Sequence, residues 1–550
     1  MQQATRSASP SAWRPGARAV RRTAWAAGIV LVTSVLLLCY LRLSDQVPVG
    51  SDGASNALQA WDMLHGNVLL RHWAVSDVSF YPAELVQYAV IEAVRGLNPG
   101  VIHFAGAMTY TLLILLAAWL AKGRATGREA LLRVLIVAVV MLAPAPGAGF
   151  TLLLSPNHFG SSVPVLLAWL AVDRLPARWS VPAVAIAATW GVTADSLVLV
   201  TGVVPMVIAC AVRAGVLLYR RASPWAEVWL AFAAIASAGL ARVAMALIRR
   251  SGGFSIHPVA TTFSGLSTIP HHLQLTGQGL LMLFGAEFSS RLSALDLAIA
   301  ALHLIGVAAA AVALGIAVSR LGRSGELAVP GLALAIICNV AAYVPTPFVQ
   351  DLFSARDISA VLPFAAVLAG RLLAGPFLGA QRAQRAQPLA GTVLAGPALR
   401  ARLTTALAVA AAACAAALGY HAARPPVPAQ NQSLVAWLAT RHLNGGLAVD
   451  YWVANSISLD SGNRITVRQV GQQMGAGSGV LTEPVPRELN SGWYTPASHY
   501  ADFYVTGDIN PGGSGEQAAA VRTFGPPAQV LHPAGYTVLV WHKNLLAALR

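Results

Sequence analysis

The chain has 550 residues, of which 56% are hydrophobic and only 11% are charged. Soluble globular proteins carry about 25% charged residues, so this composition and its recurring apolar runs indicate a membrane protein. The net charge of +15 is concentrated in the apolar part, because residues 421–550 hold eight basic and seven acidic residues. There it follows the positive-inside pattern of cytoplasmic loops. A nucleic-acid partner is therefore not expected.

The basic residues 1–22 precede a first apolar run, which begins at Thr23 and ends at Leu41. The run is long and no small-residue cleavage site follows it, so we expect an uncleaved first span. Later apolar runs predict spans at about 101–121, 131–153, 160–172, 181–194, 196–212, 225–248, 295–319, 327–345, 358–376 and 403–420. The sequence thus predicts a polytopic α-helical membrane domain over residues 23–420, with about 11 spans.

Arginine-rich loops alternate with other loops along these spans, which places the N-terminus in the cytoplasm of a plasma (inner) membrane protein. Because the number of spans is odd, the residues after the last span are expected to be extracytoplasmic. Two long outer loops are predicted, at residues 42–100 and 249–294. A proline-rich linker at 421–432 leads to residues 433–550.

Residues 433–550 are expected to form a small α/β domain, because helix-like and strand-like segments alternate there. SLVAWLATRHL and EQAAAVRTF predict helices, and GLAVDYW, RITVRQV, DFYVTG and GYTVLVWH predict short strands. The glycine-rich GAGSGV at 475–480 lacks the lysine of a phosphate-binding loop. We interpret it as a flexible loop, and no nucleotide cofactor is expected.

The segment SDGASNALQAWDMLHGN, residues 51–67, follows the first span and contains Asp52. Its polar residues recur at helical spacing opposite an apolar face, which predicts an amphipathic helix lying flat on the membrane with its polar side up. Asp52 then has two interpretations. It caps the N-terminus of this helix, or it faces a cavity, where its carboxylate could accept a proton from an attacking hydroxyl.

Two further acids in the first outer loop, Asp77 and Glu84, are candidates for a second catalytic acid. Solvated residues at the membrane interface would show the same pattern, so both interpretations stay open. Asp52, Asp77 and Glu84 could hold a hard divalent cation if they converge. Metal use is otherwise unknown from the sequence.

Five residues of the other outer segments are candidates for contacts with substrate. Asn157 and His158 lie in the loop predicted between the third and fourth spans. His257, His271 and His272 lie in the 249–294 loop, where they could bind phosphate or catalyse, or could simply be solvated.

Arg356, in SARDISAVLPFAAVLAGR, is predicted just outside the tenth span. The planar fork of an arginine at this level suits a lipid phosphate. The alternatives are a pair with Asp351 or Asp357, or a side chain that extends to lipid headgroups.

Two short motifs carry a resemblance to a known family. The outer loop reads Asp52-Gly53, then Ala-Leu, then MLHGN, and the later segment reads Arg356-Asp-Ile followed by LPFAAVLAGR. Together with the arrangement of spans, these motifs resemble the membrane-embedded GT-C glycosyltransferases, in particular the protein mannosyltransferase and aminoarabinose transferase group. The chain departs from that pattern where the second acid of an Asp-Glu pair is Gly53, and where Pro82 alone remains of a lysine–proline–proline segment.

The resemblance implies transfer of a sugar from a polyprenyl-phosphate carrier to an extracytoplasmic acceptor, which could be a cell-envelope glycan, lipid or protein. By this analogy Asp52 is the general base and Arg356 neutralises the departing lipid phosphate. Two other interpretations stay open. One is a transporter of a lipid-linked substrate, although few ionisable residues lie deep in the spans. The other is a non-catalytic envelope scaffold or an inactive relative.

Overall fold

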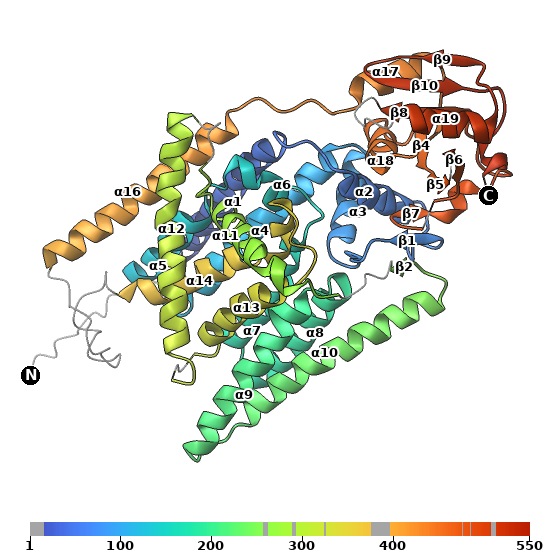
Figure 1. Cartoon of the computed structure of the whole chain (residues 1–550). Coiled ribbons are helices and arrows are strands. Elements are labelled where there is room, and N and C mark those ends of the chain that lie inside the picture. Colours follow the sequence, from blue (N-terminus) through green and yellow to red (C-terminus); the bar gives the residue numbers. More distant parts are fainter. Residues whose placement is uncertain are drawn as a thin grey trace, which may run out of the picture.

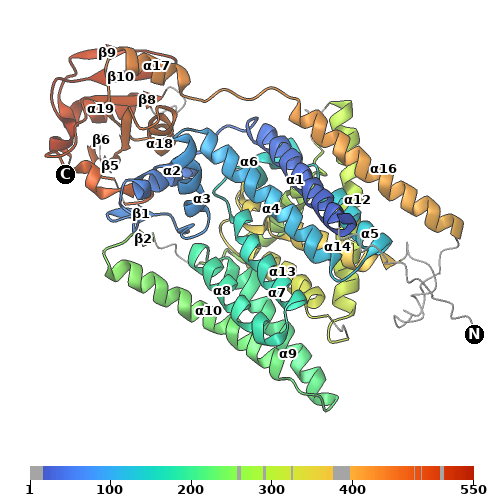
Figure 2. The ribbon, with the colours of Figure 1, turned by 180° about the vertical axis from the view of Figure 1, so that it is seen from behind.

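The structure is a computed structural model, and it describes residues 16–256, 262–288, 293–323, 326–375, 397–475, 477–484, 486–507 and 513–549. A helical part extends to Ala422, and a smaller α/β part begins at Gln432. Figures 1 and 2 both show the α/β part at one end of the helical part, over α2 and α3.

The helical part contains long helices joined by short helical turns. Its first half consists of α1 (Gly16–Ser44), α2 (Ser51–Leu64), α3 (Glu84–Arg95), α4 (Gly100–Lys122), α5 (Gly127–Met141), η1 (Pro146–Ala148), α6 (Gly149–Leu153), η2 (His158–Ser161), α7 (Ser162–Arg174) and α8 (Ala177–Ala194). Its second half consists of η3 (Leu199–Val203), α9 (Val204–Tyr219), α10 (Trp225–Arg250), η4 (Leu266–Thr268), α11 (Ile269–Leu283), α12 (Ala294–Ser319), α13 (Ala328–Tyr343), η5 (Phe353–Ile358), α14 (Val361–Leu373) and α16 (Pro397–Ala422).

Six helices among the described residues are long and apolar enough to cross a membrane: α1, α4, η3 with α9, α10, α12 and α16. The span predicted at 131–153 is not one straight helix, because α5 and the η1–α6 unit meet at a bend of 80°. Pro144 and Pro146 lie at this bend, and proline interrupts helical hydrogen bonding. Counting the bent pair as one span gives up to seven, with α13 and α14 as shorter apolar helices. The figure of about 11 spans stays a prediction.

Helix α14 lies at the centre of the bundle, where its residues from Val361 to Arg371 are all buried. The buried Arg371 guanidinium is fully compensated. It lies 2.7 Å from a carboxylate oxygen of Asp173 and 2.8 Å from one of Glu326, and it donates to the carbonyl of Leu120. A buried charge is tolerated only with such partners. This network joins one end of α4, α7 and α14.

The α/β part contains a five-stranded sheet in the order β4-β3-β8-β10-β9. β3 lies parallel to β4 and β8, whereas β10 lies antiparallel to β8 and β9. Its elements are α17 (Gln432–Thr440), β3 (Gly445–Ala448), α18 (Tyr451–Asp460), β4 (Thr466–Gln469), β5 (Gly471–Gly475), β6 (Gly477–Thr482), β7 (Leu489–Asn490), η7 (Ser491–Tyr494), β8 (Phe503–Gly507), α19 (Gly513–Phe524), β9 (Gln529–Leu531), β10 (Tyr536–Val540) and η8 (Leu545–Ala548).

Two sequence predictions for this part are wrong. GLAVDYW is not one strand, because β3 ends at Ala448 and α18 begins at Tyr451. Asp450 caps this helix, and its side chain accepts from the Trp452 N–H at 2.7 Å. The segment containing GAGSGV is not a loop either, because β5 and β6 pair there as an antiparallel hairpin.

Segments far apart in the sequence attach the α/β part to the helical part. β1 (Trp73–Val75) pairs in parallel with β2 (Ser255–Ile256) and antiparallel with β7, so both outer loops and the α/β part share one small sheet. Beside it, one oxygen of Asp62 accepts from the Trp73 indole at 2.7 Å and from Asn490 at 3.4 Å. The 421–432 linker is also anchored, since Arg424 lies 2.6 Å from Asp296.

This attachment changes the expected environment of α2. α18 packs on α2, and the polar residues Ser55, Asn56 and Gln59 are buried. The polar side of the helix is therefore covered by the α/β part. The prediction that this side is open to water on a membrane-bound helix is wrong.

Candidate functional site

Asp52 occupies the first turn of α2, whose N-cap is Gly50. The interpretation of Asp52 as the capping residue is therefore wrong. Its side chain is 37% exposed and is stabilised by the N-terminal end of the helix, where backbone N–H groups favour a carboxylate.

The Asp52 carboxylate contacts two residues that are distant in the sequence. Its Oδ2 lies 3.5 Å from Nη1 of Arg356. Its Oδ1 accepts a hydrogen bond of 3.1 Å from the Tyr451 hydroxyl. The structure thus brings together the first outer loop, the segment before α14 and the start of α18.

Arg356 belongs to η5, and its guanidinium lies over the ring of Phe353, 4.3 Å from the ring centroid. Its Nε is 3.9 Å from a carboxylate oxygen of Asp357, whereas Asp351 accepts from the backbone and hydroxyl of Ser354. Of the two acids expected as alternative partners, only Asp357 lies beside Arg356. The Arg356 side chain keeps 33% exposure, so its remaining donors can bind another anion.

Asp52, Asn157 and Arg356 line one hollow, whose empty space of about 290 Å³ includes open solvent. Its other walls are mostly apolar side chains and glycines: Gly50, Gly53, Ile102, Phe150, Leu154, Ser155 and Pro156. Asn157 is buried and donates to the carbonyl of Phe150 at 3.1 Å. The hollow combines a carboxylate, a guanidinium and apolar surface.

His158 lies between two carboxylates behind this hollow. Its Nδ1 is 2.9 Å from Asp195 and its Nε2 is 3.3 Å from Asp357. Burial alone would lower the pKa of His158, but Asp195 and Asp357 outweigh burial and raise that pKa to about 9. The histidine is therefore a cation at neutral pH, and it connects the turn after α8 to η5.

Neither second-acid candidate forms a hydrogen bond or ion pair with Asp52, although burial and the nearby charge of Asp77 raise the pKa of Asp357. Glu84 is buried against Gly160 in a neighbouring hollow, and burial raises the pKa of its carboxyl to about 8. Asp77 is exposed and forms no hydrogen bond or ion pair with the residues that the structure describes. No three histidine, cysteine or acidic side chains of the described residues are arranged to hold a metal ion, so the conditional cation site of Asp52, Asp77 and Glu84 is not formed.

Of the three histidines of the second outer loop, the two that the structure describes do not line the hollow that contains Asp52. His257 falls outside the described residues. His271 is exposed on α11, and its neighbour His272 is buried, with Nδ1 2.8 Å from the carbonyl of Val344. His272 has a structural role, which is to hold α11 on the end of α13.

The structure adds a buried acid that the sequence did not indicate, Glu488. Its backbone carbonyl accepts from Ser55 at 3.1 Å, and its φ of 54° is rare for a residue other than glycine. Its Oε2 has no hydrogen-bond partner within the described ranges. Burial, with the nearby charges of Asp52 and Asp77, raises the pKa of Glu488 well above its ordinary value. A buried carboxyl group whose ionisation is disfavoured therefore lies near Asp52.

Gly53 stands where the glycosyltransferases that the sequence resembles have the second acid of an Asp-Glu pair, and a steric reason explains the glycine. A Cβ at Gly53 would lie 2.9 Å from a methyl carbon of Ile102 and 3.1 Å from the carbonyl oxygen of Ser155. α2 approaches α4 too closely there for a glutamate side chain.

A solved structure of ArnT from Cupriavidus metallidurans, in the apo state, matches this chain with a TM-score of 0.54 and 14% sequence identity. The match covers 96% of this chain and 99% of that chain. ArnT is an aminoarabinose transferase of the GT-C family, so the predicted GT-C-like fold is confirmed. No protein family matches the sequence, and no curated protein matches it at the sequence level.

Proposed function

We propose that this protein is a glycosyltransferase of the plasma (inner) membrane, which moves a sugar from a polyprenyl-phosphate carrier to an extracytoplasmic acceptor. One observation carries the proposal: Asp52 and Arg356, 3.5 Å apart, line the same hollow. A carboxylate can take a proton from an acceptor hydroxyl. A guanidinium can neutralise a phosphate that departs with the electron pair of the broken bond.

In the proposed reaction, the acceptor oxygen bonds to the anomeric carbon while Asp52 takes the hydroxyl proton. The bond between that carbon and the carrier phosphate breaks, and the phosphate leaves with the electrons. Negative charge therefore moves from Asp52 to the phosphate. Arg356 lies beside Asp52, so its guanidinium can bind the phosphate as that charge develops. Its long, partly exposed pair with Asp52 is weak, so the guanidinium is free to bind phosphate.

Other residues position these two groups. His158 holds Asp357, the neighbour of Arg356, through the 3.3 Å contact. The hydroxyl of Tyr451 holds one oxygen of Asp52 and leaves the other facing Arg356. The α/β part is therefore a component of the site in this proposal, not an appended module.

The walls of the hollow suggest a direction for each substrate. Ile102, Phe150 and Leu154 come from the helical part, and their apolar surface suits a lipid-linked donor. Tyr451 approaches Asp52 from the α/β part. We expect the donor to enter from the membrane side and the acceptor from the side of the α/β part.

The test is transfer in reconstituted membranes, with labelled polyprenyl-phosphate sugars as donors and a cell-envelope extract as acceptor. Arg356→Gln should slow transfer and weaken use of the donor, whereas His271→Gln should match the wild type because His271 is exposed and outside the hollow. Transfer that is unaffected by Arg356→Gln would contradict the role of Arg356. Failure of the folded wild type with every donor would favour the scaffold interpretation.

A further inference from the structure

A second hollow lies across the bundle from Asp52, between α9 and the connection from α12 to α13. The η3–α9 unit starts beside Asp195 and spans 21 residues to Tyr219, which corresponds to about 30 Å of helix. Arg220, on the rim of this hollow, is thus separated from the Asp52 site by about the thickness of a bilayer core.

The walls of this hollow, whose empty space of about 570 Å³ includes open solvent, are apolar. They consist of Ala209, Val212, Val216 and Leu217 from α9, with Leu321, Gly322, Leu327 and Pro330 from the other side. Gly322 lies close to α9, since a Cβ there would be 3.6 Å from Val216 and 3.7 Å from Val212. The two walls therefore pack against each other below the rim.

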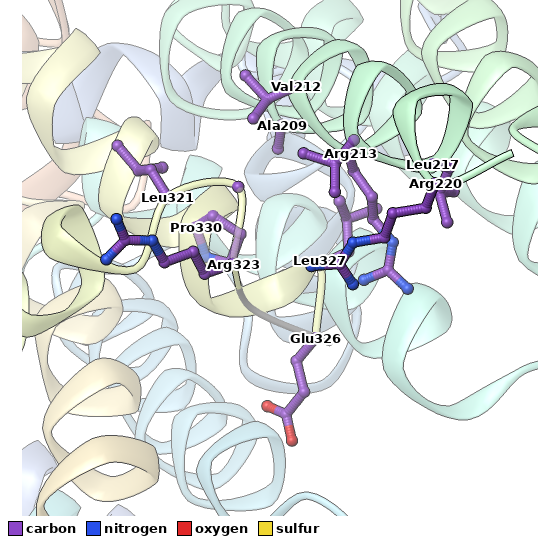
Figure 3. Close-up of a pocket in the computed structure, with 12 residues that line it drawn as sticks. Ala209, Val212, Arg213, Leu217, Arg220, Leu321, Arg323, Glu326, Leu327 and Pro330 are labelled. Atoms are coloured by element: carbon purple, nitrogen blue, oxygen red, sulfur yellow. The ribbon is translucent and has the colours of Figure 1, made fainter. Parts of the chain in front are cut away.

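The rim carries Arg213, Arg220, Arg323 and Glu326 (Figure 3). Arg213 pairs with Glu227 at 2.9 Å. Glu326 pairs with Arg371 at 2.8 Å, and in Figure 3 its carboxylate points away from the arginines. Arg220 and Arg323 form no ion pair with any residue in the part of the chain that the structure describes. The rim is left with uncompensated positive charge.

Exposed arginines at one end of a membrane protein need no specific ligand, because they extend to headgroups in general. What distinguishes this rim is the apolar wall that continues from it along α9. A ligand with both an anionic group and hydrocarbon can use both features at once, whereas free phosphate can use only the arginines.

We infer that this hollow binds an anionic membrane phospholipid, with its phosphate at Arg220 and Arg323 and hydrocarbon along the α9 wall. Basic pockets between membrane helices bind anionic headgroups in this way, and the planar guanidinium matches a phosphate. The inference does not depend on the proposed glycosyl transfer, because the site is at the opposite end of the bundle.

The test uses native mass spectrometry of the purified full chain in detergent. The ligands are phosphatidylglycerol, phosphatidylcholine with the same acyl chains, and inorganic phosphate. The variant is Arg220→Gln/Arg323→Gln. The matched control is Arg178→Gln/Arg402→Gln, which removes the same charge from the starts of α8 and α16, at the same end of the bundle and outside the hollow. All four arginines are exposed, so folding should be preserved.

We expect phosphatidylglycerol to bind preferentially to the wild type and to the control. We expect the Arg220→Gln/Arg323→Gln variant to bind it about tenfold more weakly or worse, from the loss of charge-assisted hydrogen bonds. Equal binding of phosphatidylcholine, or an equal loss in the control, would overturn the inference in favour of general headgroup contact. Binding of inorganic phosphate as tight as that of the lipid would assign the site to a free anion instead.

Discussion

His158 should stabilise the folded protein in a way that depends on pH. Its imidazolium is held between Asp195 and Asp357, at 2.9 and 3.3 Å, and these carboxylates raise its pKa from 6.5 to about 9. A shift of this size corresponds to about 3 kcal/mol of stabilisation of the protonated form. Because the folded pKa lies above the unfolded one, this stabilisation is fully present below about pH 6.5 and is lost as the pH rises through about 9.

Replacing this histidine removes the cation and leaves two carboxylates facing each other. We expect His158→Asn to lower stability by up to about 3 kcal/mol at pH 6 to 7, and the difference from the wild type to vanish near pH 10. Burial raises the pKa of Glu84 to about 8 and the His158 charge lowers it, so the Glu84 carboxyl should be harder to ionise in His158→Asn.

The assay is the apparent thermal unfolding midpoint in detergent at fixed heating rate, measured from pH 6 to pH 10. His271→Asn is the matched control, because His271 is exposed on α11. A difference between wild type and His158→Asn that stays constant with pH would refute the reasoning. An equally large effect in His271→Asn would also refute it.

Three further changes should have distinct effects. Gly53→Glu should destabilise the protein by about 1–3 kcal/mol rather than supply a second acid, because a Cβ there lies 2.9 Å from Ile102; thermal unfolding measures this. Asp62→Ala should lower the free energy of unfolding by about 1–3 kcal/mol, because the indole N–H of Trp73 loses its hydrogen-bond acceptor. Limited proteolysis of the 421–432 linker should then become faster. Tyr451→Phe should lower kcat about tenfold without unfolding the protein, because Asp52 loses one hydrogen bond; transfer assays measure this.

Each of these changes has a control or a contradictory result. Gly215→Ala, where a Cβ meets nothing within 4 Å, should be harmless, and an equal loss there would remove the steric explanation for Gly53. Unchanged proteolysis in Asp62→Ala would show that Asp62 is not needed to hold the α/β part on the helical part. Faster transfer by Tyr451→Phe would mean that Tyr451 blocks Asp52 instead of positioning it.

The helices could be predicted from the sequence because their signal is local. The apolar run 295–319 coincides with α12, Ala294–Ser319, since a bilayer-length run has few alternatives to a helix. The bend after α5 was predictable in principle from Pro144 and Pro146. Of the predicted spans, those at α7, α8, α13 and α14 are not among the helices of the described residues that are long and apolar enough to cross a membrane, because they are short or less apolar.

The contacts between the site residues could not be predicted from the sequence, because they join segments that are far apart in the chain. Asp52 and Arg356 were both singled out, but they are 304 positions apart and only the fold makes them neighbours. Tyr451 does not stand out when GLAVDYW is predicted as one strand, although Asp450 is a recognisable helix cap. Glu488 has no sequence signal, since its burial and its closeness to Asp52 arise from the packing of the α/β part on α2.

Turnover by Asp52→Asn tests the proposed function most directly. The protein would be reconstituted with the donor that the wild type uses, and His271→Asn would be the control because His271 is exposed and does not line the hollow. We expect Asp52→Asn to lose about 10²–10⁴-fold in kcat, which is the usual contribution of a general base. His271→Asn should keep wild-type turnover. Wild-type turnover by a folded Asp52→Asn protein would contradict the role of Asp52 as the base.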